Sequence, residues 1–165
     1  MVKFVPPAVI LILGFCFFSC ADIGQSQFQT LEYAEWSKSD TLSFEFSITD
    51  TLSRYDILIH IRNNKDYDFS NIFLVSTLDF PESDRTIVDT LEYEMTDVEG
   101  NWLGQSQGTV VENILFFREG VVFPEKGKYE MSFNHLMRRK GFVGGLSALK
   151  GITDVGVEIK PENNQ

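Results

Sequence analysis

The sequence has few of the residues on which most catalytic and metal sites depend. Its 165 residues include two cysteines, Cys16 and Cys20, and two histidines, His60 and His135. Both cysteines fall within the first twenty residues, so the rest of the chain can hold no disulfide, cysteine nucleophile or cysteine metal site. A zinc site needs three or four convergent ligands, and His135 has no second histidine at helical spacing. We therefore expect neither a metal nor a cofactor.

Sequence patterns of common catalytic sites are also missing. No G-x-S-x-G elbow occurs, and the stretch GFVGG at 141–145 lacks the Lys-Ser/Thr pair of a phosphate loop. His60 lies in the run DILIHIR on the face opposite the isoleucines, which predicts a half-exposed strand residue and not a ligand. The carboxylates show no spacing that singles out a glycosidase pair. The sequence predicts that the protein is not an enzyme.

Long blocks of one charge are absent, and the charge balance is acidic. The formal net charge is −10, and the acidic residues are scattered along the chain. Such a chain has no electrostatic reason to bind nucleic acid. Anionic headgroups would also repel it, so any attachment to a membrane must come from elsewhere.

The one long apolar run lies at the start of the chain and ends at a cysteine. The run Ala8 to Phe18 is too short to span a bilayer, but its length is typical of the apolar region of a signal peptide. The small residue Ser19 and then Cys20 follow, as in bacterial lipoprotein signals. We expect residues 1–19 to be removed and Cys20 to carry the lipid, which provides the contact with membrane lipid. An ordinary signal peptide with an incidental cysteine, or a short membrane anchor, are the alternatives.

The remainder of the chain alternates apolar and polar residues with a period of two. LSFEFSIT at 42–49 and DILIHIR at 56–62 are the clearest examples, and turn residues separate about eight such runs. This pattern predicts an all-β fold, a single β-sandwich of immunoglobulin-like or jelly-roll type, over residues 28–165. Residues 20–27 are predicted to be a polar tether. A short helix near 134–138, followed by a glycine-rich loop, is predicted where the alternation fails.

Aromatic residues beside Asn, Asp and Gly stand in several predicted loops. Tyr67 and Phe69 lie in KDYDFSN, Trp102 lies in EGNWLG, and Trp36 follows YAE. Exposed rings would anchor a partner protein, or would stack on a sugar if they formed a flat row. Buried rings would instead plug the end of the sandwich. Tyr67, Phe69 and Trp102 are the candidate interaction residues.

The order of several motifs resembles the gliding motility lipoprotein GldH family of Bacteroidota. The motifs are the Cys20 signal, SDTLSFEFSITDT, IRNNKDYDFSNIFLVSTLDFP, DTLEYEM with EGNWLG, FPEKGKYEMSFNHLMR and GITDVGVEIK. The resemblance implies a non-enzymatic, lipid-anchored envelope component connected with gliding motility and the type IX secretion apparatus, acting through contacts with other envelope proteins. A lipid-anchored glycan-binding module is the alternative. We expect attachment to the outer membrane, and because no acidic run follows Cys20, we expect the domain to face the periplasm.

Overall fold

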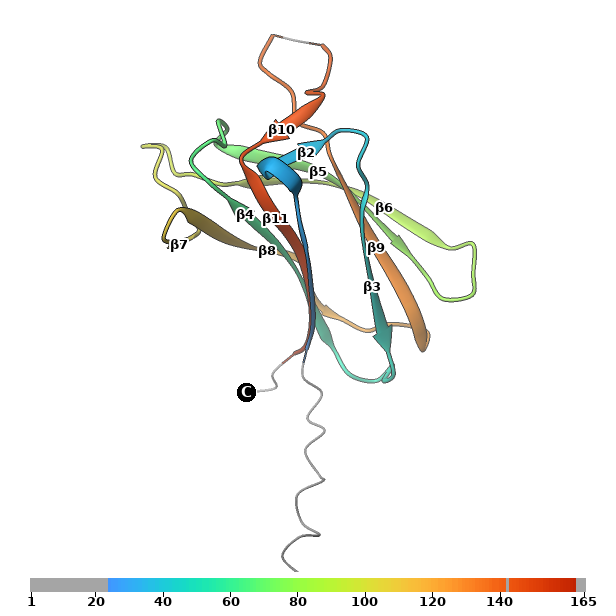
Figure 1. Cartoon of the computed structure of the whole chain (residues 1–165). Coiled ribbons are helices and arrows are strands. Elements are labelled where there is room, and N and C mark those ends of the chain that lie inside the picture. Colours follow the sequence, from blue (N-terminus) through green and yellow to red (C-terminus); the bar gives the residue numbers. More distant parts are fainter. Residues whose placement is uncertain (1–23, 142, 163–165) are drawn as a thin grey trace, which may run out of the picture.

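The computed structural model describes residues 24–141 and 143–162, which fold into two antiparallel β-sheets packed face to face (Figure 1). Within this part of the chain, eight strands have six or more residues, as the alternation predicted. They are β1 (Gln25–Thr30), β3 (Leu42–Ile48), β4 (Tyr55–Asn63), β5 (Asn71–Asp79), β6 (Thr86–Glu94), β8 (Val110–Val121), β9 (Gly127–His135) and β11 (Ile152–Pro161). Shorter elements are β2 (Glu35–Ser37), β7 (Gln105–Gln107), β10 (Ala148–Lys150) and the 3₁₀ turn η1 (Glu32–Ala34).

The strand order identifies the sandwich as a jelly roll. One sheet has the order β1-β11-β4-β8-β7 and the other β3-β9-β5-β6, with β2 and β10 forming a separate pair. Strands pair in a nested series: β5 with β6, β4 with β8, β3 with β9, β2 with β10 and β1 with β11. The chain thus doubles back at the β5–β6 hairpin and wraps around itself, as jelly rolls do. The immunoglobulin-like alternative is excluded.

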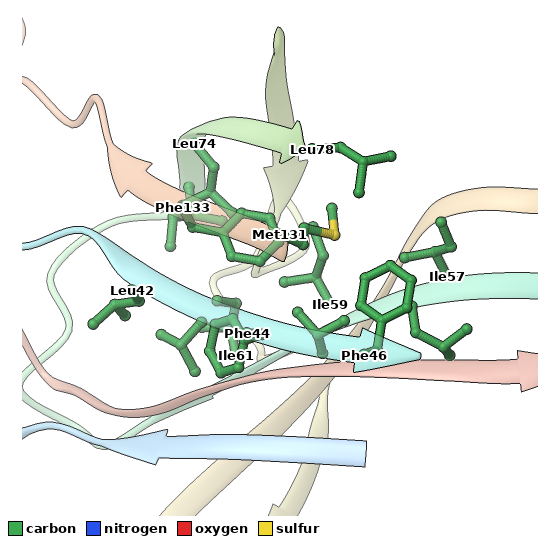
Figure 2. Packing of buried hydrophobic residues seen from close by; sticks show 14 of the residues in the cluster. Leu42, Phe44, Phe46, Ile57, Ile59, Ile61, Leu74, Leu78, Met131 and Phe133 are labelled. Carbon is green, nitrogen blue, oxygen red and sulfur yellow. The ribbon is translucent and has the colours of Figure 1, made fainter. Parts of the chain in front are cut away.

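The inward-facing side chains of the two sheets form the core, as the period of two requires. Five side chains from four of the long strands illustrate this core and are all between 0% and 3% exposed: Phe44, Phe46, Ile59, Leu74 and Val157. Figure 2 shows side chains of β3, β5 and β9 meeting the isoleucines of β4 between the sheets. Burial of this apolar surface is the main force that holds the sandwich together.

A row of glutamines closes one long edge of the sandwich. Gln25 and Gln29 of β1 each donate a side-chain hydrogen bond of 2.6 Å to β3, to the carbonyls of Ser47 and Ser43. Gln27 donates in the same way to the carbonyl of Glu45, and the Ser47 amide donates back to Gln25 Oε1 at 2.9 Å. The prediction of a tether over 20–27 is therefore wrong from Gln25 onward, because these residues form a strand that covers the free edge of β3.

At the opposite long edge, side-chain contacts and not backbone hydrogen bonds between strands join β6 to β8. The Tyr93 hydroxyl of β6 donates to the carbonyl of Phe116 on β8 at 2.9 Å. Arg118 of β8 forms an ion pair with Asp89 of β6. These contacts join the two sheets where no strand pairing does.

Two further predictions about local structure need correction. Asn134 and His135 belong to β9 and pair with Val75 and Leu74, so the predicted helix near 134–138 does not form. Tertiary pairing overrides local preference here. The end of the glycine-rich segment is also ordered, since Ala148–Lys150 forms β10, which pairs with β2.

The connections divide between two ends of the sandwich. β1 begins, and β11 ends, at what we call the proximal end, together with the connections 49–54, 80–85 and 122–126. The opposite, distal end carries the connections 31–41, 64–70, 95–109 and 136–151, each of which crosses between the sheets (Figure 1). Nowhere in residues 24–141 or 143–162 is there a helix long and apolar enough to cross a membrane.

Candidate functional site

The distal end is the candidate site because it brings together the aromatic residues singled out in the sequence. Tyr67 lies in the distal connection 64–70 and is 3% exposed. Its ring meets Phe69 at a centroid distance of 5.8 Å and Trp102 at 6.3 Å. Phe69 and Trp102 are half-buried against the same core. Tyr67 is thus a buried support for the loops, whereas Phe69 and Trp102 keep part of their surface in solvent.

The polar end of Tyr67 is fixed as firmly as its ring. Its hydroxyl donates a hydrogen bond of 2.7 Å to the carbonyl of Asn71 at the start of β5. Burial raises the pKa of the Tyr67 hydroxyl well above its usual range, so the group stays protonated and remains a donor. The loop 64–70 is therefore held to the sandwich by both ring packing and a hydrogen bond.

Trp36 plugs the neighbouring part of the distal end. It is fully buried on β2, and its Nε1 donates to the carbonyl of Asp40 at 3.0 Å. Its ring meets the buried ring of His135 edge-on at a centroid distance of 5.6 Å. Leu149 of β10, also fully buried, lies opposite Trp36 in the strand register. The short pair β2 and β10 thus seals the core beneath the loops.

Gly151 joins three of the distal connections at one point. Its amide donates to the carbonyl of Ala34, and its carbonyl accepts from the amide of Asn64, both at 2.8 Å. A Cβ at Gly151 would lie 2.2 Å from the backbone nitrogen of Tyr67, and its φ of +85° also favours glycine. Only glycine allows the loops to approach so closely.

The connection after β6 forms a rigid projecting tip. Asp97 Oδ1 accepts hydrogen bonds from the amides of Glu99 and Asn101, and Asp97 Oδ2 accepts from the Asn101 side chain. These hydrogen bonds, the Asn101 side-chain bond above all, lower the pKa of the Asp97 carboxyl. The tip holds Val98 at 98% and Leu103 at 57% exposure.

Exposed apolar side chains are a feature of the distal end as a whole. Besides Val98 and Leu103, the connections there expose Tyr33, Leu136 and Val143. Single exposed apolar residues are common on protein surfaces, but several on the loops of one end mark a surface suited to contact. The distal end therefore combines rigid support from buried rings with apolar groups directed to solvent.

A second cluster lies on the outer face of the five-stranded sheet. His60 is 6% exposed there, so the prediction that it is half-exposed is wrong, because Phe28 covers its ring edge-on at 5.2 Å. His60 Nε2 lies 2.9 Å from Glu158 Oε2 and Nδ1 lies 3.6 Å from Glu112 Oε1. Arg62 binds Glu112 and lies over the Phe28 ring. Arg62 and Glu112 thus pair within this cluster, and Glu158 meets the ring of His60.

These clusters do not assemble into a recognisable reactive centre. Within residues 24–141 and 143–162, no three His, Cys, Asp or Glu side chains converge closely enough to hold a metal ion. Cys20, the predicted lipid attachment residue, lies outside the described residues. The sequence patterns had located the aromatic loops but missed the His60 cluster. Its only signal was the spacing of His60 and Arg62 on one face of β4.

Fold and site together define a class, the jelly-roll β-sandwich that carries its most elaborate loops at one end. Comparison with protein families then identifies the particular family. The family described as GldH lipoprotein matches residues 25–159, which span β1 to β11. The chain belongs to the GldH lipoprotein family.

Two curated relatives extend over nearly the whole chain. The chain is 41% identical over 155 residues to a protein of Christiangramia forsetii named gliding motility lipoprotein GldH homolog, covering 94% of this chain and 95% of that protein. It is 32% identical over 155 residues to gliding motility lipoprotein GldH of Flavobacterium johnsoniae, covering 94% and 96%. The resemblance read from the motif order is thereby confirmed.

Proposed function

We propose that this protein is a non-catalytic, lipid-anchored component of the cell envelope that binds another envelope protein through its distal end. The observation that carries the proposal is that several exposed apolar side chains stand on the distal loops, with Val98 and Leu103 the clearest examples on one connection. Apolar and aromatic groups of this kind are the usual anchors of protein interfaces. The half-exposed rings of Phe69 and Trp102 belong to the same surface.

The proposed lipid on Cys20 agrees with this assignment of ends. Cys20 stands five positions before Gln25, the first residue of β1, so an acyl group on Cys20 keeps the proximal end within about 18 Å of the membrane. The distal loops lie at the other end of the strands and would be directed away from such a lipid. We propose the outer membrane as the site of attachment, with the domain facing the periplasm.

The names of the two relatives suggest the process in which this contact takes part. Both are named as gliding motility lipoproteins. We propose that the protein acts in gliding motility, in association with the type IX secretion apparatus. The alternative of a glycan-binding module is less well supported, because Trp36 and Tyr67 are buried and no flat row of exposed rings lies among the described loops.

Lipid attachment is tested by replacing Cys20, the proposed acceptor of the acyl group. In the native organism, Cys20→Ala is expected to abolish incorporation of a fatty-acid probe and to leave the protein mislocalised, because the thiol is the proposed acceptor. Wild type and a Cys16→Ala variant serve as controls and should both be labelled. Equal labelling of the Cys20→Ala protein would refute lipidation at this residue.

The contact surface is tested by comparing two ends of the same molecule. Val98→Ser/Leu103→Ser removes exposed apolar groups from the distal end, and Leu52→Ser removes one that is 90% exposed at the proximal end. Proteins copurified from native membranes are quantified by mass spectrometry for each variant. We expect the distal variant alone to lose its partner, at a cost of at least about 2 kcal/mol in binding. Full recovery by the folded distal variant would contradict the proposal.

A further inference from the structure

One segment of this acidic protein has the opposite charge. Between Glu130 and Asp154 the sequence has no acidic residue, yet it contains Arg138, Arg139, Lys140 and Lys150. This segment forms the distal connection between β9 and β11. A protein with a net charge of −10 therefore places its basic run at the end that we propose to be the contact surface.

A groove lies beside this run, on the side of the four-stranded sheet. It has a volume of about 330 Å³, and we call it the distal groove. Its lining consists of Lys38, Phe73, Leu136, Met137, Arg138, Val143 and Gly145. Two cations and several apolar groups thus share one hollow, and none of its lining residues is acidic.

The walls of the groove are fixed by hydrogen bonds at several points. The Leu136 amide donates to the carbonyl of Phe73 at 2.9 Å, and the Leu146 amide donates to the carbonyl of Met137 at 2.8 Å. The Lys38 amide donates to the carbonyl of Ser147 at 2.8 Å. Because backbone bonds from three segments set its shape, the groove needs little ordering when a ligand enters.

Neither cation of the groove has a carboxylate partner within residues 24–141 and 143–162. Among the described residues, the arginines and lysines that form ion pairs are Arg54, Arg62, Arg118 and Lys128. Neither Lys38 nor Arg138 is one of them. Their charges are therefore available to an external anion, whereas Arg62 beside His60 is already paired with Glu112.

We propose that the distal groove binds an acidic segment of the partner protein, with carboxylates at Lys38 and Arg138 and an apolar side chain against Leu136 and Val143. Charge complementarity selects the occupant, since the groove is basic and apolar together. This inference rests on the proposed function and specifies the chemistry of the partner. A protein segment fits better than a lipid headgroup because the groove lies at the end opposite Gln25, where the chain from the proposed lipid enters the domain, and offers apolar contacts at the same site.

The test uses the full-length lipoprotein in micelles of a non-ionic detergent. The probe is a short fluorescent peptide of Glu, Leu and Ser, and the same peptide with Gln in place of Glu is the control ligand. We expect Lys38→Gln/Arg138→Gln to weaken binding of the acidic peptide about tenfold or more. The matched variant Lys126→Gln/Lys160→Gln makes the same change in net charge at the proximal end and should bind as wild type. Binding should also weaken as salt screens the charges.

Several outcomes would overturn the inference. These are equal binding of the Glu and Gln peptides, equal loss in both double variants, or binding only to vesicles that contain phosphatidylglycerol. A dimer seen by sedimentation and lost in Lys38→Gln/Arg138→Gln would assign the groove to a second copy of this chain. If Val98→Ser/Leu103→Ser loses the native partner but Lys38→Gln/Arg138→Gln retains it, the proposed function stands and the acidic segment is refuted.

Discussion

The ring of Phe28 lies directly against Gly156 on the outer face of the five-stranded sheet. A Cβ at Gly156 would stand 2.6 Å from Cδ1 of that ring and 2.9 Å from the carbonyl oxygen of Gln27. The missing side chain of Gly156 thus makes room for Phe28, which in turn covers His60. The order of β1, β11 and β4 in the sheet brings these three residues into one row.

Gly156→Ala should therefore destabilise the domain. We expect a loss of about 1–3 kcal/mol in the free energy of unfolding, because the ring or the paired strand must move. Thermal and denaturant melts measure it. Gly144→Ala is the matched control, since a Cβ there meets no atom within 4 Å. In a Phe28→Ala background the penalty of Gly156→Ala should be smaller, and an unchanged penalty would contradict the contact.

The glutamine row makes a prediction about the edge of β3. Replacing Gln25, Gln27 and Gln29 together by Ala removes three side-chain donors, each worth about 0.5–1.5 kcal/mol. The freed edge of β3 should also become open to pairing with other chains. Melting and light scattering test the two effects. Ser26→Ala is the control on the same strand, and an unaltered triple variant would show that the row does not stabilise the edge.

Tyr67 should behave as a structural residue. Tyr67→Ala is expected to cost about 3–5 kcal/mol in unfolding free energy because it empties a buried ring site. Tyr67→Phe should cost about 1–3 kcal/mol, since it leaves the carbonyl of Asn71 without its donor. Tyr33→Phe, at a fully exposed ring, should change little. A Tyr67→Ala protein that melts like wild type would show that the buried Tyr67 ring does not stabilise the domain.

His135 should make stability depend on pH near neutrality. Burial chiefly lowers the pKa of His135, Lys38 lowers it further, and the Trp36 backbone partly opposes the shift. The unfolded chain, with an ordinary pKa of about 6.5, then binds the proton more readily than the folded chain. The contribution of neutral His135 is complete above that pH and is lost as the pH falls below it.

The measurement is a series of melts from pH 7.5 to pH 5. Wild type should lose stability across this range more steeply than His135→Phe. The carboxyls of Asp50 and Asp97, whose pKa values are lowered by hydrogen bonds, contribute only below about pH 4 and do not interfere. Parallel curves for the two proteins would exclude His135 as the titrating group.

The core of the fold was predictable because a strand that is buried on one face has apolar residues at every second position. Phe44 and Ile59 stand in runs whose apolar residues alternate, and both face the interior. The order of the strands was not predictable. Pairing of β1 with β11 depends on residues at opposite ends of the chain, and both jelly rolls and immunoglobulin-like sandwiches satisfy the same alternation.

The errors have a common physical cause. QSQ at 25–27 reads as part of a polar tether because β1 joins β3 through glutamine side chains and not through an apolar face. His135 and Asn134 stay in a strand because β5 offers them partners. The aromatic loops were found in the sequence, but the burial of Tyr67 depends on its approach to Gly151, a contact between distant segments that local patterns do not encode.

The nested pairing also limits the order in which the strands can pair. β5 and β6 are neighbours in the chain, whereas β1 can pair with β11 only once the C-terminal part of the domain is present. Until then the free edge of β3 lacks its glutamine cover. The first strand of the domain is thus among the last to be secured, and a chain exported as we propose is exposed to mispairing at this edge until β11 has arrived.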